Sequence, residues 1–192
     1  MQAIQFKFPV DIKHDSWNFG KRWAITKHRF HVTFFEIEVR SDMVHSVIEW
    51  VNAEIGSLAA LLASIEFSRW HVFIKEKQHF AVLVPADKEE WADIDSEERS
   101  NPIVEARQIF LLRMFRAFGC TTEPVLLEAW LYRDASGDPL FRCSLYNRPG
   151  VWYPHVTIAV KFTHLSEPAL LAWPAAVARI KPDDIYFEIL KK

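Results

Sequence analysis

The sequence predicts an α+β fold built on largely antiparallel sheet. Strand-like segments are mixed with helical ones, two pairs of strand-like segments are joined by short polar connections, and 50% of the 192 residues are hydrophobic. Strands that are mixed with helices and partly joined by hairpins are typical of α+β proteins. A chain of this length fits one domain, and its apolar content is enough for a sizeable core.

The first third of the chain alternates between extended and helical patterns. Residues 4–10 are strand-like, and residues 23–39 alternate and are rich in β-branched and aromatic side chains, so we expect strands there. Ser41 is a candidate helix N-cap, with Asp42 in the first turn. The helix after it is predicted by apolar residues at helical spacing, namely Val44, Val47, Ile48, Val51, Ile55, Leu58, Leu62 and Ile65.

Two hairpins are predicted farther along the chain. Segments 70–74 and 80–84 are apolar and flank a short polar connection. Segments 125–133 and 140–146 flank residues 134–138, whose sequence Asp-Ala-Ser-Gly-Asp is typical of a turn. Each pair should therefore form two adjacent antiparallel strands.

A polar, acidic stretch at 87–99 is predicted to be a surface loop or partly helical. Asn101 is a candidate helix cap because a proline follows it at the first helical position. The helix should run to about Phe118 and stop at Gly119.

The end of the chain repeats the pattern of its beginning. We expect a strand over 152–162, a shorter helix from Ser166 that Pro174 interrupts, and a final strand over 185–190. A strand that contains His-Val-Thr, then a helix, then a further strand or hairpin occurs near the start and again near the end. This order favours two structurally similar halves.

Composition excludes several classes of function. The formal net charge of −2 gives no global positive field, so a general nucleic-acid coat is excluded. Cys120 and Cys143 provide neither a disulfide framework nor the ligand spacing of a zinc site. The beginning of the sequence lacks the apolar block of a secretory signal, and the longest apolar run is far shorter than the roughly 20 residues of a membrane span. We expect a cytoplasmic monomer without membrane contact.

The tripeptide His-Val-Thr occurs twice, at His31–Thr33 and at His155–Thr157. Side chains alternate along a strand, so the His and the Thr of each copy point to the same side. In the second copy Val156, Ile158, Val160 and Phe162 form the apolar side. In the first copy the apolar parity shifts after Phe34, and a bulge near Phe35 would account for this shift.

The two copies suit phosphate chemistry. Two imidazoles that face each other can divide proton transfer between a base and an acid, because the pKa of a free histidine is about 6.5. A threonine hydroxyl beside each can donate to a phosphate oxygen as negative charge develops. Such a site needs neither a metal nor a cofactor, and opening a cyclic phosphate with water is its natural reaction. Taken alone, either copy is more often a core or edge histidine than a catalyst.

The motifs His31-Val-Thr33-Phe34 and His155-Val-Thr157-Ile158 resemble those of the two-histidine phosphoesterase superfamily, which includes bacterial RNA 2′,3′-cyclic phosphodiesterases, historically called 2′-5′ RNA ligases. The proline before His155 and the upstream Asn147-Arg148-Pro149 are also similar to that family, whereas the polar segment that ends at Lys21 departs from it. The resemblance implies a single domain over 1–192, with two pseudo-symmetric lobes of largely antiparallel sheet and flanking helices around a central groove. It also implies that the two histidines are the acid/base pair and that Thr33 and Thr157 bind phosphate.

We therefore expect a metal-independent phosphodiesterase that acts on 2′,3′-cyclic phosphates or 2′-5′-linked RNA or nucleotides. The alternatives are a hydrolase of cyclic nucleotide or cyclic oligonucleotide signals and a nucleotide-binding module without turnover. Trp152 and Tyr153 are possible base-stacking contacts, although large aromatics are more often core residues. Arg148 is a possible phosphate contact, although a solvated loop arginine explains it about as well. His71 and His79 are interpreted as surface or edge residues.

Overall fold

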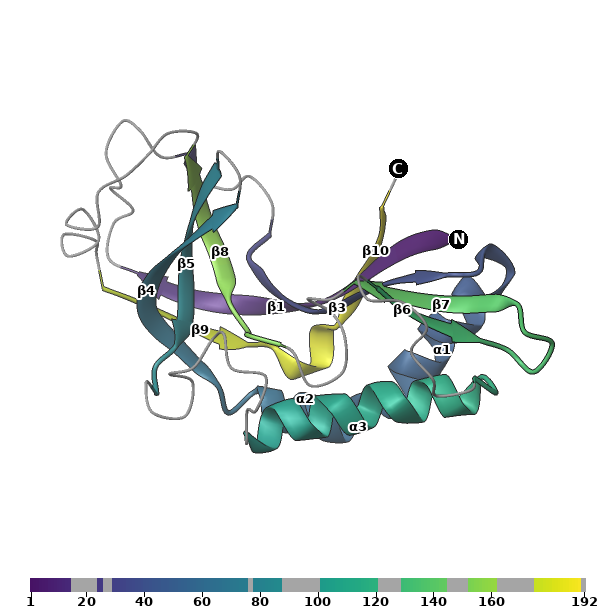
Figure 1. Cartoon of the computed structure of the whole chain (residues 1–192). Helices are drawn as coiled ribbons and strands as arrows, with labels where there is room; N and C mark the ends of the chain where they lie inside the picture. The colour runs from purple at the N-terminus through teal and green to yellow at the C-terminus, as the bar shows by residue number, and fades with distance from the viewer. Residues whose placement is uncertain are drawn as a thin grey trace.

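The computed structural model describes residues 1–14, 24–25, 29–75, 78–87, 101–120, 129–144, 152–161 and 175–190 (Figure 1). Ten strands form one sheet, and every pairing described in it is antiparallel. The strand order is β10-β1-β9-β4-β5-β8-β3-β7-β6, with β2 paired to β8 and β1 also paired to β3. The α+β class with antiparallel sheet is thus confirmed.

The strands have the bounds β1 Gln2–His14, β2 Ala24–Ile25, β3 His31–Val39, β4 Glu66–Lys75, β5 Gln78–Pro85, β6 Ala129–Arg133, β7 Pro139–Ser144, β8 Val156–Lys161, β9 Ala176–Ile180 and β10 Tyr186–Leu190. The described helices are α1 Val44–Glu54, α2 Gly56–Leu62 and α3 Pro102–Ala117, with short 3-10 turns at Ser41–Met43 and Pro182–Asp184. In Figure 1 the three α-helices lie below the sheet, and the strands β4, β5 and β8 rise at one end of it.

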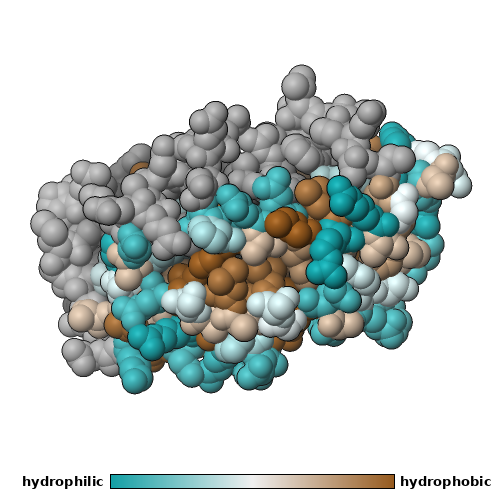
Figure 2. All heavy atoms as spheres, turned by 90° about the horizontal axis from the view of Figure 1, so that it is seen from below, coloured by the Kyte–Doolittle hydropathy of each residue, from teal (hydrophilic) through white to brown (hydrophobic). Residues whose placement is uncertain are grey.

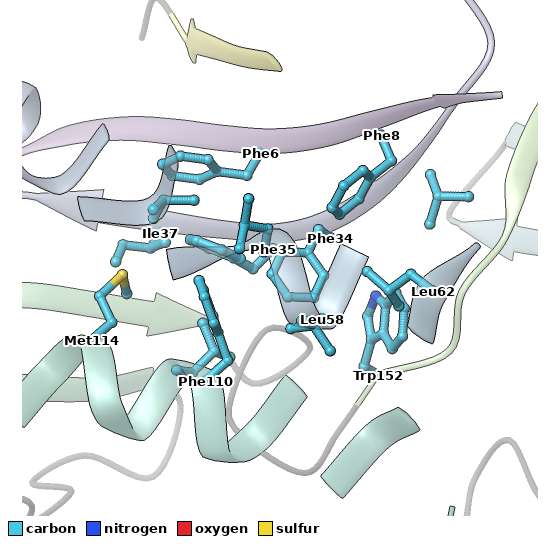
Figure 3. Close-up of a cluster of buried hydrophobic side chains, with 14 of the residues drawn as sticks. Phe6, Phe8, Phe34, Phe35, Ile37, Leu58, Leu62, Phe110, Met114 and Trp152 are labelled. Carbon is cyan, nitrogen blue, oxygen red and sulfur yellow. The ribbon is translucent and has the colours of Figure 1, made fainter. Parts of the chain in front are cut away.

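The core fills the space between the helices and one face of the sheet. Side chains from β1 and β3 meet side chains from α2 and α3 in one buried cluster, whose labelled members in Figure 3 are Phe6, Phe8, Phe34, Phe35, Ile37, Leu58, Leu62, Phe110, Met114 and Trp152. Because side chains alternate along β1 and β3, the residues of these strands that do not enter the core face the side of the sheet that is away from the helices.

The helix α3 begins and ends as the sequence predicts. The side-chain oxygen of Asn101 accepts hydrogen bonds from the backbone N–H groups of Ile103 at 2.8 Å and Val104 at 3.3 Å. Pro102 is the first helical residue, where its missing N–H costs nothing. Gly119 follows the helix with a φ of 71°, a conformation that glycine adopts without steric penalty.

The hairpins β4–β5 and β6–β7 and the final strand β10 are confirmed, but other predicted elements differ. Ser41 starts a 3-10 turn and does not cap α1 with its side chain, and the long helix is divided at Ile55 into α1 and α2. The strand β9 was not predicted. The loop expected at 87–99 lies almost wholly outside the described residues, and so does the helix expected from Ser166.

The bulge predicted near Phe35 is confirmed. Phe6 pairs with Phe35, whereas the next residue, Lys7, pairs with Thr33, so Phe34 is an extra residue in β3. Phe34 and Phe35 are both buried, with exposed fractions of 0% and 1%. The extra residue reverses the facing of the strand and keeps Glu36 out of the core.

The face on the helix side is partly apolar at its surface. Figure 2, viewed from below, shows hydrophobic side chains gathered near the middle and ringed by hydrophilic ones. Exposed apolar residues on the helices are Leu61 of α2 and Ile109 of α3. None of the helices in the described ranges is both long enough and apolar enough to cross a membrane.

Candidate active site

The two His-Val-Thr copies lie side by side on the sheet. Val32 of β3 pairs with Val156 of β8 in antiparallel register, and these valines are buried, with exposed fractions of 1% and 0%. In an antiparallel pair the flanking residues are also opposite each other, so His31 faces Thr157 and His155 faces Thr33 across the strands. All four side chains leave the sheet on the face opposite the valines and are partly exposed. The strands β3 and β8 are both internal to the sheet, and His155 immediately precedes β8.

Each imidazole is oriented by a backbone carbonyl two residues earlier. Nδ1 of His31 lies 2.8 Å from the carbonyl oxygen of Arg29, and Nδ1 of His155 lies 3.1 Å from that of Tyr153. A carbonyl oxygen only accepts hydrogen bonds, so Nδ1 carries the proton in both rings. In the neutral form, Nε2 of each ring therefore keeps a lone pair that can take a proton.

The same bulge follows both copies. Val82 of β5 pairs with Thr157, whereas Ala81 pairs with Ala159, so β8 carries an extra residue immediately after its threonine, as β3 does. The prediction that Ile158 and Val160 share the apolar side is therefore wrong beyond Ile158, because the bulge reverses the facing. Ala159 is fully buried and Val160 is only half-buried.

The strand registers extend this correspondence to two groups of three strands. Thr33 pairs with Lys7 of β1, which pairs with Tyr186 of β10. Thr157 pairs with Val82 of β5, which pairs with His71 of β4. The groups β3-β1-β10 and β8-β5-β4 thus place Tyr186 and His71 at equivalent positions, each two strands away from a motif threonine.

Trp152 belongs to the core, which is the more common role of a large aromatic and not that of a base-stacking contact. Its side chain is 6% exposed and its indole N–H donates to the carbonyl oxygen of Thr33 at 3.1 Å. Figure 3 shows the ring within the buried cluster, where it lies edge-on to Phe34 with ring centroids 6.0 Å apart. This hydrogen bond ties the segment before His155 to the strand of the first motif.

Arg107 of α3 lies beneath the same strands. Its Nε donates to the carbonyl oxygen of Phe34 at 2.8 Å, and its guanidinium lies 5.3 Å from the centre of the Trp152 ring. Within the described part of the chain, its two terminal nitrogens have no hydrogen-bond partner. Burial lowers the pKa of Arg107 to about 9, so the group still carries its charge at neutral pH.

His71 faces the motifs and does not lie at an edge, contrary to the prediction. The strand β4 is internal to the sheet, and the ring of Phe73 lies 5.0 Å from that of His71 and 4.8 Å from that of His155. The pKa of His71 is lowered by burial and then by the charge of Arg69. His79 was also predicted to be exposed, but it is buried with an exposed fraction of 3%.

The surroundings of His155 lower its pKa. Its pKa is lowered from the usual 6.5, first by burial and further by the charges of His31 and His71, against an opposing effect of its hydrogen bond to Tyr153. The neutral form of His155 is therefore favoured at neutral pH. The influence of His31 and His71 also shows that the three imidazoles are near one another.

Lys7 and Tyr153 also lie next to the motif residues. Lys7, opposite Thr33, is 6% exposed and its ammonium contacts the carboxylate of Glu188. The hydroxyl of Tyr153 accepts from Arg69 at 3.4 Å, and base stacking by Tyr153 stays a prediction. Arg148, the remaining predicted contact, lies outside the described residues.

Sequence reasoning did not find Lys7, Arg69 or His71 as site residues. The alternation of Phe6, Lys7 and Phe8 marks the lysine as facing away from the core, but that pattern alone does not indicate a site. Across the described ranges, no group of three or more His, Cys, Asp or Glu side chains is arranged to hold a metal ion. No protein-family model matches the sequence, and a search of the curated proteins finds no significant match.

Proposed function

We propose that this protein is a metal-independent phosphodiesterase that hydrolyses 2′,3′-cyclic phosphates or 2′-5′-linked RNA or nucleotides with His31 and His155 as its acid/base pair. The observation that carries the proposal is the arrangement around the Val32–Val156 pair, where each histidine lies opposite the threonine of the other copy. Two matched imidazoles and two matched hydroxyls on one face have no structural role that would require this symmetry.

A phosphate above the valine pair would have one threonine hydroxyl and one imidazole on either side. Water attacks phosphorus while one imidazole takes a proton from it through Nε2. The bond from phosphorus to O2′ or O3′ breaks, and the other imidazole donates its proton to that leaving oxygen. One ring gains a proton and the other loses one, and the threonines donate to the oxygens on which negative charge increases.

His155 suits the role of base in the hydrolytic direction. Its pKa is lowered chiefly by burial, which favours the neutral ring that a base needs. The remaining role, that of the protonated acid, then belongs to His31, which lies 2 residues after the Arg29 carbonyl that orients it. The sequence alone leaves this assignment open because both copies have the same residues.

The equivalent registers of β3-β1-β10 and β8-β5-β4 support a bilobal two-histidine phosphoesterase-like fold over residues 1–192, with the two lobes related by an approximate two-fold axis through the valine pair. Cys120 and Cys143 are buried free thiols, which suits a reducing compartment. The proposal therefore includes a cytoplasmic monomer whose substrate is an RNA end, an oligonucleotide or a cyclic nucleotide.

The test is turnover of nucleoside 2′,3′-cyclic phosphates, 2′-5′ oligoadenylate and cyclic dinucleotides with excess EDTA present and with product analysis. His31→Ala and His155→Ala should each lower kcat by about 10²- to 10⁴-fold, the usual contribution of a positioned acid or base. Thr33→Ala and Thr157→Ala should each raise the barrier by about 1–3 kcal/mol through a lost charged hydrogen bond, whereas the serine variants should recover most of the rate.

The matched control is His45→Ala, because His45 is exposed on α1 and far from the motifs in the fold. This variant should keep the wild-type rate. Full activity of His155→Ala, or activity that disappears with EDTA, would refute the mechanism. Turnover of only cyclic dinucleotides would favour the signal-hydrolase alternative, and tight nucleotide binding without turnover would favour a binding module.

A further inference from the structure

The strand groups β3-β1-β10 and β8-β5-β4 differ in whether the cationic side chains near them contact carboxylates. On the β10 side, Arg29 lies 3.4 Å from the carboxylate of Asp184, and Lys7 contacts that of Glu188. Asp184 lies in the 3-10 turn two residues before Tyr186, the first residue of β10, whereas Arg69 lies within β4 two residues before His71. The residue two positions before the equivalent pair Tyr186 and His71 is thus a carboxylate on one side and a guanidinium on the other.

The hydrogen-bond partners that the described residues provide for Arg69 are neutral. Its Nε donates to the carbonyl oxygen of Pro85 at 2.8 Å, and its terminal nitrogen is 3.4 Å from the hydroxyl of Tyr153. Over the described ranges of the chain, no carboxylate forms an ion pair with it. The first contact fixes one edge of the guanidinium, which leaves its other donors available to a ligand.

Arg69 also lies on the face that carries the motifs. It pairs with Val84, the residue after Leu83, and Leu83 pairs with Val156, so Arg69 is two strands away from His155 on the same side. Two strand spacings amount to about 10 Å, a distance that a long side chain and a bound nucleotide together can span. Farther along the same strand as Arg69, the ring of Phe73 contacts the rings of both His71 and His155.

We propose that Arg69, together with His71 and Tyr153, binds a second phosphate group of the substrate. The substrate class is then a nucleoside 2′,3′-cyclic phosphate that carries a further phosphate at its 5′ side, as an oligonucleotide end does, and not a lone nucleoside cyclic phosphate. Guanidinium groups match the geometry of phosphate oxygens through paired donors. On the β10 side, Lys7 and Arg29 already contact carboxylates. The second phosphate is therefore expected on the Arg69 side, and this sets the direction in which the substrate lies across the motifs.

This inference rests on the proposed function and deepens it. The pKa of His71 is lowered by burial and by Arg69, so His71 is favoured in its neutral form at neutral pH, and the charge that attracts the second phosphate belongs to the arginine.

The test compares kcat/KM for adenosine 2′,3′-cyclic phosphate and for the same compound with a 5′-phosphate. Wild type should prefer the phosphorylated compound. Arg69→Gln, which removes the charge but keeps hydrogen-bonding groups, should reduce that preference by about 10- to 100-fold, as expected for a lost charged hydrogen bond. Arg29→Gln is the matched control and should keep the wild-type ratio, because the guanidinium of Arg29 already has a carboxylate partner.

A second measurement keeps the two proposals separable. Calorimetric binding of adenosine 2′,5′-bisphosphate and adenosine 2′-monophosphate should show tighter binding of the bisphosphate to wild type, and Arg69→Gln should abolish the difference. Equal handling of both substrates and both ligands by wild type would overturn the second-phosphate site while the phosphodiesterase proposal stands. Absence of turnover would end the phosphodiesterase proposal, and the binding data would still decide the subsite.

Discussion

The carbonyl of Tyr153 orients the ring of His155, burial lowers its pKa, and the charges of His31 and His71 lower the pKa further. If His155 is the base, the acidic limb of the pH dependence of kcat/KM reports its pKa in the free enzyme. That limb should therefore lie below the usual imidazole value of 6.5.

Replacing His71 should move this limb. In His71→Asn the charge that opposes protonation of His155 is removed, so the pKa of His155 rises and the acidic limb shifts to higher pH. The measurement is kcat/KM against pH for wild type and variant, with His45→Asn on the exposed face of α1 as the control that should not shift. An unchanged limb in His71→Asn would show that His155 is not the group that titrates there.

At the scale of elements, α3 supports the strands that carry the first motif, since Arg107 in its second turn donates to the carbonyl oxygen of Phe34. The start of α3 depends on Asn101, whose side chain accepts from two backbone N–H groups. Asn101→Ala should lower the free energy of unfolding by about 1 kcal/mol, within a range of about 0.5–2 for lost N-caps.

Asn101→Ser is the comparison variant, because its shorter side chain still offers an oxygen to the first turn and should recover most of the loss. Urea unfolding of the three proteins measures the difference from their midpoints at a common slope. Equal destabilisation by Ala and Ser would mean that the buried amide of Asn101 matters through its packing and not through the cap.

The facing of a strand could be predicted from the sequence where charged residues mark the side that does not enter the core. Glu36 and Glu38 revealed the bulge in β3 because carboxylates in a core-facing position would be costly. The equivalent bulge in β8 was hidden, since Ile158, Ala159 and Val160 are apolar at both parities. The two copies of His-Val-Thr were found from the sequence because they repeat one tripeptide.

At the scale of the whole molecule, the order of the strands in the sheet could not be predicted from the sequence. The strand β1 pairs with β3, β9 and β10, which are far apart in the chain, and the short β9 has an Ala-Val-Ala pattern that gives little strand signal. Arg69 reaches Tyr153 across 84 positions of sequence. Such neighbours follow from the strand registers of the sheet, so the residues that surround the motifs could not be derived from local patterns.

The burial of His71 and His155 also makes the free energy of unfolding depend on pH. Burial is the first cause that lowers the pKa of both His71 and His155 from the usual 6.5. Between those lowered values and 6.5, the unfolded chain binds more protons than the native protein, so the free energy of unfolding increases with pH in that window. Stability is therefore unaffected by these groups above about pH 6.5 and decreases as the pH falls below it, until both native histidines are also protonated.

Urea unfolding at pH 8, 6.5 and 5 tests this coupling. Wild type should lose stability between pH 6.5 and 5, and the double variant His71→Asn/His155→Asn should lose less over the same interval, because asparagine does not titrate. His45→Asn should keep the wild-type dependence, since its side chain is exposed on α1. If the double variant retains the full decrease, the loss of stability in acid arises from other groups, and the two histidines are not held in an environment that disfavours their charged form.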